Sequence, residues 1–442
     1  GGGLMQLVAY GAQDIYLTGN PQITFFKVVY RRHTNFATES IEQTFTGSVD
    51  FGRKISCVVD RNGDLLYKMY LEVDIKMPNL LNPAKGGECS QAGNYATRLG
   101  HALVQEVQLE IGGQCIDTHY GEWMELWSQL TMNNDELVKH RNLIDGNIKN
   151  TSCGNQRKLY IPLQFWFNRN PGLALPLIAL QYHEVKLNVI LNSSLECGIY
   201  SSDSAEVSIQ QICLFCDYIF LDTDERRRFA QVSHEYLIEQ LQFNNITSVD
   251  GKEACANVEL RLNHPCKELV WTVQPQVPGC TTSAGCSEAR VHPFDWSRES
   301  CSDTGTVGTS QQDGKALDNM LKAKLQLNGH DRFREREGTY FRCVQPFQHH
   351  TGGTLQSWTG NAANALSVDN GFFYVYSFAL KPEEHQPSGT CNFSRIDNAV
   401  LQMALAVNKD SESPSPKFIK VYATNYNVLR IMSGMGGLAY SN

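Results

Sequence analysis

The sequence predicts an all-β protein built from two consecutive copies of one antiparallel sandwich. Three observations carry this prediction: short runs alternate between apolar and polar side chains, turn-forming dipeptides separate the runs, and the runs recur in the same order. Period-two alternation buries one face of a strand and leaves the other face polar, as in antiparallel sheets with one solvated side.

Composition agrees with this fold class. The chain has 442 residues, which suggests two or three domains. Charged residues make up 19% of the chain, below the roughly 25% of an average soluble domain, and the sequence holds 35 Gly, 18 Tyr and 20 Phe. This mixture argues against disorder, a coiled coil or a helical bundle, and favours strands joined by many tight turns.

The strands follow one another along the chain with clear punctuation. Alternating runs occupy residues 71–76, 107–111, 185–189 and 258–262. Turn signals of the hairpin type lie between the runs, at Asn62-Gly63, Gly112-Gly113, Asp250-Gly251 and Asn328-Gly329. This spacing predicts sandwiches or barrels rather than units in which strands and helices alternate.

The repeat rests on four collinear matches. They pair Ile41-Glu42-Gln43 with Ile238-Glu239-Gln240, Ile75 with Val273, Leu109-Glu110-Ile111-Gly112-Gly113 with Leu325-Gln326-Leu327-Asn328-Gly329, and Leu187 and Val189 with Leu401 and Met403. The offset grows from 198 residues at the second match to 216 at the third. The extra length therefore lies between Val273 and Leu325, where residues 275–312 predict a long irregular loop.

These features divide the chain into four parts. We predict an N-terminal arm over residues 1–24, a first sandwich over 25–221, a linker helix over 222–236, and a second sandwich with a C-terminal tail over 237–442. Asp222 is the expected N-cap of the linker helix, with Glu225 three residues later completing a capping box. A second helix is predicted near residues 122–132.

Charge and hydropathy exclude several classes of protein. The net charge is −8, and the parts before and after residue 221 carry −5 and −3, so no basic surface for nucleic acid is expected. No run approaches the roughly 20 apolar residues that span a bilayer. The Gly-rich start is interpreted as a processed cytosolic N-terminus rather than a signal peptide.

Motifs for catalysis and metal binding are incomplete. His183-Glu184 and His234-Glu235 lack the second histidine of a zinc motif, because Leu187 and Ile238 stand in its place. Cys213 and Cys216 lie on a predicted strand, where side chains three residues apart point to opposite faces. The adjacent His349 and His350 would likewise face opposite sides if they lay on a strand. We therefore expect no enzyme, no catalytic residue, no metal and no cofactor.

Cysteines and sequons add two further expectations. The 14 cysteines have no framework spacing, so reduced thiols are predicted, although Cys280, Cys286 and Cys301 share one loop and their pairing stays open. The sequons make the chain a candidate glycoprotein. The candidate N-glycosylation sites are Asn150, Asn192, Asn245 and Asn392.

Long stretches of the sequence resemble the major capsid proteins of nucleocytoplasmic large DNA viruses, the viruses of algae and the giant viruses. The resemblance extends over nearly the whole chain and is weakest in the loop at 275–312. The similar stretches are residues 6–14, 17–27, 30–36, 171–185, 222–229, 374–380 and 394–399.

This resemblance implies two consecutive eight-stranded antiparallel jelly rolls, with a few short helices in loops and in the linker. It implies homotrimeric, pseudo-hexagonal capsomers that tile an icosahedral shell, with neighbouring capsomers and minor capsid proteins as partners. The chain would be made in the host cytoplasm and reside in the virion, near an internal membrane that it does not span. Phe294, Trp296 and Trp358 are candidate interface residues in loops, or else local core residues.

Two other classes of protein stay open at this point. Jelly rolls also serve as lectins, so a carbohydrate-binding protein at the virion surface is the alternative function. A jelly-roll enzyme is the other class, and it is weakened by the missing pair of histidines two residues apart.

Overall fold

The computed structural model describes residues 2–76, 98–145, 156–194, 196–197, 208–275, 294, 296, 318–352, 372–407 and 416–440. The chain separates into two compact units, residues 1–36 and residues 37–442. Most of the predicted loop at 275–312 therefore lies outside the described residues, as does Trp358.

The N-terminal unit is a short helical segment without a core. It contains α1 (Gly2–Val8), η1 (Ala12–Asp14) and α2 (Ile15–Thr18), none of which buries a residue. The first strand, β1, begins at Phe36, so the separate segment is longer than the predicted arm of residues 1–24. A segment of this length with no buried side chain has little apolar burial to stabilise it alone.

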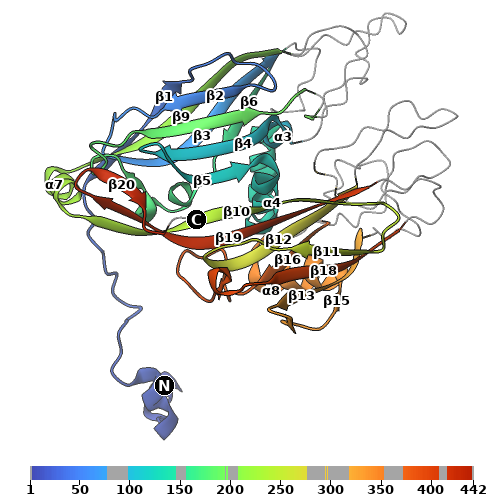
Figure 1. The fold of residues 1–442 in the computed structure, drawn as a ribbon. Coiled ribbons are helices and arrows are strands. Elements are labelled where there is room, and N and C mark those ends of the chain that lie inside the picture. Colours follow the sequence, from blue (N-terminus) through green and yellow to red (C-terminus); the bar gives the residue numbers. More distant parts are fainter. Residues whose placement is uncertain are drawn as a thin grey trace, which may run out of the picture. The chain divides into compact units, whose positions relative to one another are not determined.

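The first jelly roll packs two antiparallel sheets face to face (Figure 1). One sheet has the order β1 (Phe36–Thr44), β9 (Ser208–Leu221), β3 (Leu65–Lys76), β6 (Gln156–Pro162), with β7 (Leu175–Pro176) also paired to β3. The other has the order β2 (Lys54–Val58), β8 (Val185–Leu191), β4 (Val104–Ile111), β5 (Gln114–Tyr120). Their inner faces form one core of mostly aliphatic side chains.

The second jelly roll repeats this arrangement (Figure 1). One sheet has the order β10 (His234–Val249), β19 (Lys417–Met432), β12 (Pro265–Pro275), β16 (Phe373–Ser377), with β17 (Cys391–Asn392) and β20 (Met435–Leu438) added. The other has the order β11 (Cys255–Glu259), β18 (Ala399–Leu405), β13 (Met320–Leu327), β14 (His330–Asp331), with β15 (Arg336–Glu337) paired to β13.

The predicted repeat is confirmed strand by strand. The matched residues Ile75 and Val273 lie in β3 and β12, which hold the same place in equivalent sheets. The two hairpin turns are also equivalent, because Gly112-Gly113 joins β4 to β5 and Asn328-Gly329 joins β13 to β14. All four of these turn residues have positive φ, which tight two-residue hairpins require.

Alternation explains the burial of the strands. In β3, Leu71, Val73 and Ile75 face the core and are at most 1% exposed, whereas Glu72 and Asp74 on the other face are half-buried. The predicted run at 258–262 is wrong at its end, because β11 stops at Glu259. The next residue, Leu260, is still buried, and its N–H donates to Ala399 O outside the strand.

The helices are short. In the described residues after the N-terminal segment they are α3 (Leu99–Leu103), α4 (Gly121–Thr131), α5 (Asn134–Ile144), α6 (Trp166–Arg169), η4 (Pro171–Leu173), α7 (Thr223–Gln231), η5 (Tyr340–Val344), α8 (Gln345–His349) and η7 (Phe393–Arg395). The helix predicted near residues 122–132 is thus confirmed as α4. His349 ends α8 and His350 follows it, so the two adjacent histidines do not lie on a strand.

The helix after the first jelly roll has the predicted N-cap without the predicted capping box to Glu225, and it ends earlier than predicted. Asp222 is the N-cap of α7, and its carboxylate accepts a hydrogen bond from Thr223 N–H at 2.7 Å. The helix does not continue to residue 236, because Val232 is already extended and His234 pairs with Ile431 in the adjacent strand. The residues from His234 onward therefore pair with β19 as strand β10 instead of extending the helix.

Candidate assembly surfaces

Helix α4 forms the joint between the two jelly rolls (Figure 1). Met124 points into the core of the first roll. The opposite face of α4 packs against the outer face of the β10–β19–β12–β16 sheet. The buried side chains of this joint include Trp123, Leu126, Trp127 and Leu130 from α4, and Leu241, Val270, Phe373, Val375 and Tyr422 from the sheet.

Glu122 is the polar centre of this joint. Its carboxylate accepts hydrogen bonds from the Thr272 hydroxyl at 2.9 Å and the Tyr422 hydroxyl at 3.1 Å. It also accepts from Trp296 Nε1 at 3.0 Å and pairs with Lys420 Nζ at 2.5 Å. Burial, and then the negative charge of Glu122, raise the pKa of Tyr422 well above its usual value, so its hydroxyl stays a donor.

Two of the predicted interface residues belong to the same joint. Phe294 and Trp296 are 3% and 0% exposed within the single chain and pack in the cluster around α4. Their assignment to an interface between chains is therefore wrong, and the alternative of local core residues holds. The bulky rings are buried inside the chain because the sheet of the second roll offers them an apolar face there.

A second contact between the rolls is ionic. Arg169 of the first roll lies 3.0 Å from Glu239 of the second, and Lys267 Nζ lies 2.7 Å from the same carboxylate. Burial alone would raise the pKa of Glu239, but a hydrogen bond from His385 and the charges of Lys267 and Arg169 lower it to about 2. A cavity of about 240 Å³ lies beside this group and is lined in part by its charged side chains.

His350 is held between two carboxylates next to this group. Its Nε2 lies 3.0 Å from Glu268 and its Nδ1 lies 2.9 Å from Glu383, and the imidazole is 0% exposed. Burial alone would lower the pKa of His350, but the two carboxylates raise it to about 9. The ring is therefore a buried cation at neutral pH, and it ties the end of α8 to β12.

A further buried ion cluster fixes α4 to its own roll. Glu125 pairs with Arg98 at 3.2 Å and with His101 Nδ1 at 2.7 Å, and Gln129 Nε2 donates to it at 2.6 Å. Burial raises the pKa of Glu125, but the charge of Arg98 and the hydrogen bond from His101 outweigh this effect and lower it. The orientation of α4, and hence of its outer apolar face, is set by this cluster.

Two surfaces of the body leave large apolar side chains partly or fully exposed to solvent. On the outer face of the first roll, Tyr70 stacks on Phe215 with ring centroids 5.2 Å apart and lies 6.1 Å from Tyr160. These three rings are half-buried. On the second roll, Val344 and Phe347 of the η5–α8 segment are 39% and 88% exposed.

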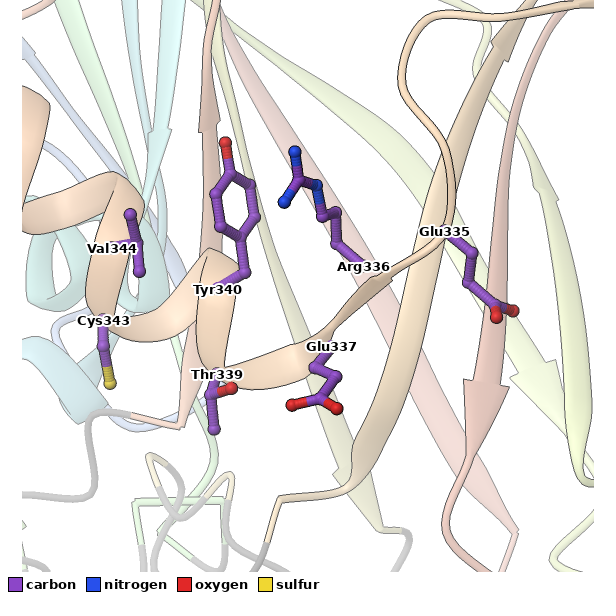
Figure 2. Close-up of a pocket in the computed structure, with 7 residues that line it drawn as sticks. All are labelled: Glu335, Arg336, Glu337, Thr339, Tyr340, Cys343 and Val344. Atoms are coloured by element: carbon purple, nitrogen blue, oxygen red, sulfur yellow. The ribbon is translucent and has the colours of Figure 1, made fainter.

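An open pocket of about 420 Å³ lies along η5 (Figure 2). Its lining residues are Glu335, Arg336, Glu337, Thr339, Tyr340, Cys343 and Val344. The Arg336 guanidinium lies 4.9 Å from the centre of the Tyr340 ring, and Figure 2 shows the two side chains next to each other. Its lining of mixed charge and one aromatic ring does not assemble a catalytic group.

The described residues contain no group of three His, Cys, Asp or Glu side chains placed to hold a metal ion. Among them there is also no helix long and apolar enough to cross a bilayer. Cys216 points into the first core, whereas Cys213 contacts Gln211 on the other face of β9, as the strand spacing predicted.

The cysteines of the described segments are free thiols. Cys57, Cys197, Cys213, Cys216 and Cys266 are buried, and burial raises the pKa of the Cys57 thiol to about 11. Cys280, Cys286 and Cys301 lie outside the described residues.

The sequons differ in their surroundings. Asn245 and Asn392 are exposed, and Asn392 caps η7 through a hydrogen bond from Ser394 N–H. The Asn192 amide donates to Ala102 O at 2.8 Å, so its nitrogen is already engaged. Asn150 lies outside the described residues. N-glycosylation at these sites stays a prediction.

Sequence reasoning missed Glu122 and His350. The signal for Glu122 was an acid at the start of the aromatic-rich stretch Gly121-Glu122-Trp123-Met124-Glu125-Leu126-Trp127, which was interpreted only as a helix. His350 had no such signal, because its partners Glu268 and Glu383 are far from it in sequence.

Two jelly rolls in tandem, joined through α4, define the double jelly-roll class of protein fold. Residues 24–222 match the family described as major capsid protein N-terminus, and residues 225–437 match the family of large eukaryotic DNA virus major capsid proteins. The chain belongs to this family of major capsid proteins.

Relatives and solved structures agree with that assignment. The chain is 47% identical to the major capsid protein of Pyramimonas orientalis virus and 45% identical to that of Paramecium bursaria Chlorella virus 1, with 100% of both chains covered in each case. A structure of the PBCV-1 virus capsid is 39% identical, covers 95% of this chain and 100% of that one, and has a TM-score of 0.72. The Faustovirus major capsid protein, at 13% identity and a TM-score of 0.68, shares the fold.

Proposed function

We propose that the chain is the subunit of a homotrimeric, pseudo-hexagonal capsomer, and that many such capsomers tile an icosahedral shell. The observation that carries this proposal is the identical strand order of the two jelly rolls. A trimer has only three-fold symmetry, but three chains with two similar blocks each present six blocks around one axis. Such blocks can pack hexagonally with their neighbours.

The N-terminal segment is proposed to contact other proteins of the shell. Its exposed apolar side chains include Leu4, Leu7, Phe25, Phe26 and Tyr30, of which Phe26 is 97% exposed. Apolar surface of this extent is normally covered by a partner in an assembled structure. Minor capsid proteins beneath the shell, close to an internal membrane, are the proposed partners, and synthesis in the host cytoplasm completes the proposal.

The solution mass of the purified protein tests the capsomer. One chain has a mass of 49.6 kDa, so a trimer of about 149 kDa is expected at micromolar concentration. A stable species of one chain at high concentration would refute the capsomer. Glycan-array binding by the same sample would support the carbohydrate-binding alternative.

A further inference from the structure

The helical segment after the β13–β14 hairpin repeats the helix after the β4–β5 hairpin. It begins at Gly338, as α4 begins at Gly121, and both glycines lie against the first residue of the central strand of the hairpin sheet. A Cβ at Gly121 would lie 2.2 Å from Val104 O, and a Cβ at Gly338 would lie 2.3 Å from Met320 O. The two helical segments therefore hold equivalent places in the two rolls.

Their inward faces are buried alike, but their outward faces are not. The inward residues are Met124, Glu125, Ser128 and Gln129 in α4, and Phe341, Arg342, Gln345 and Pro346 in the η5–α8 segment. The outward residues are Trp123, Leu126, Trp127 and Leu130 in α4, and Tyr340, Cys343, Val344 and Phe347 in the η5–α8 segment. The first outward face is buried in the joint, whereas Phe347 of the second is 88% exposed.

The sheets that would receive these faces are equivalent too. Within the chain, α4 sits on the sheet position where Val270 pairs with Val375 and with Tyr422. The strand registers place Glu72, Tyr160 and Cys213 at the same position of the first roll, because Glu72 pairs with Tyr160 and with Cys213. The adjacent row there holds the stacked rings of Tyr70 and Phe215.

We propose that the η5–α8 face of one chain docks on the outer face of the β1–β9–β3–β6 sheet of the next chain. The occupant is a second copy of this chain, because α4 of the first roll already packs in this way on the β10–β19–β12–β16 sheet of the second roll. The η5–α8 segment and the β1–β9–β3–β6 sheet hold the equivalent positions in the other roll. This inference rests on the proposed capsomer and specifies its contact. The contact is head-to-tail, and such contacts close into a ring when the rotation between subunits permits it.

The polar groups at the centre of this contact are complementary. In the joint within the chain, the acid Glu122 of the helix faces the donors Thr272 and Lys420 of the sheet. At the equivalent positions, the hydroxyl of Thr339 would face the acid Asp74 and the amide of Gln211. Within the chain the helix supplies the acceptor and the sheet supplies the donors. In the proposed contact the helix supplies a donor and the sheet supplies an acceptor, so a hydrogen bond can form in both.

Single substitutions test each side of the contact. Phe347→Asp and Val344→Asp should raise the protein concentration at which half of the chains are trimeric by at least tenfold, because each places a charge in an apolar contact. Tyr160→Asp should do the same from the sheet side, whereas Tyr160→Phe should keep the trimer. Val138→Asp on α5, where Val138 is 57% exposed, is the matched control and should not change the mass.

Mixing two variants tests the head-to-tail geometry. Phe347→Asp keeps an intact sheet and Tyr160→Asp keeps an intact helix, so an equimolar mixture can form one joint and no ring. The expected product is a heterodimer of about 99 kDa, twice the 49.6 kDa of one chain, measured by native mass spectrometry after melting curves confirm that both variants are folded.

The possible outcomes separate this inference from the capsomer. A trimeric wild type with a monomeric Phe347→Asp and the 99 kDa mixed species supports the contact. A trimeric wild type whose Phe347→Asp and Val344→Asp variants assemble equally well, or whose variant mixture yields no heterodimer, overturns the contact and leaves the capsomer standing. A monomeric wild type overturns both.

Discussion

At the scale of single residues, the polar groups that matter most are buried between elements distant in sequence. The Glu122 carboxylate accepts three hydrogen bonds from the second roll and forms an ion pair with Lys420 of the same roll. The His350 imidazole lies between the carboxylates of Glu268 and Glu383. Such groups are stable only when all partners are present, because a buried charge that loses its partner keeps the full desolvation penalty. They therefore fix how the two rolls and their helices are joined.

Removing the charge of Glu122 should loosen the joint. Glu122→Gln leaves Lys420 without its carboxylate, and we expect a loss of about 2 kcal/mol in the free energy of unfolding, measured by urea denaturation. Glu335→Gln is the matched control, because Glu335 and its partner Lys322 are each 52% exposed. A surface pair of that kind contributes less than about 1 kcal/mol. Equal effects of the two substitutions would contradict the role of Glu122.

The pKa of His350 predicts a loss of stability at alkaline pH. The pKa is raised from 6.5 to about 9, so the folded state binds this proton more tightly than the unfolded state. The contribution is complete below about pH 6.5, and it is lost as the pH rises through about 9. The melting temperature of the wild type should fall over this window.

The variant His350→Gln isolates this effect. It should be less stable than the wild type at pH 6 by about 3 kcal/mol, and its melting temperature should vary less between pH 6.5 and 9. His330→Gln, at an exposed histidine of β14, is the control and should follow the wild type. A pH profile of His350→Gln that parallels the wild type would show that His350 is not the group responsible.

At the scale of elements, the sequence predicted strands better than it predicted their ends. Alternation located β3, β4 and β8, since one buried face produces that pattern by itself. It failed at Leu260 and Leu262, which are buried side chains beyond the end of β11. The linker helix was overextended for a similar reason, because pairing with β19 begins at His234 and overrides local helix signals.

The candidate sites were less predictable than the fold. Loop aromatics such as Trp296 look alike whether they cover their own chain or a neighbour, and only the position of the second-roll sheet decides between the two. The face that holds Val344 and Phe347 has ordinary helical spacing, but that spacing does not distinguish a face buried in its own chain from one left exposed. Its importance appears only when the two rolls are compared.

The N-cap of α7 gives a prediction at this scale. Asp222→Ala should lower the free energy of unfolding by about 1 kcal/mol, because the helix loses the acceptor for Thr223 N–H. Asp397→Ala, at an exposed aspartate outside any helix, is the control for the loss of one charge. An unchanged melting temperature of Asp222→Ala would remove the capping role of this residue.

At the scale of the whole molecule, duplication explains both the joint within the chain and the proposed contact between chains. The first roll presents a helix to the second roll, and the second roll presents an equivalent helix to solvent. Each chain thus has one satisfied and one open contact of the same kind. A protein with one open helix face and one open sheet face is suited to closed head-to-tail assembly.

A cryo-electron microscopy reconstruction of the purified particle, calculated without imposed symmetry, tests this account most directly. The account predicts three chains that form six lobes around a three-fold axis, with the η5–α8 segment of each chain on the Tyr70–Phe215 face of the next. A particle with two-fold contacts, or a three-fold particle in which this face is open to solvent, would contradict it.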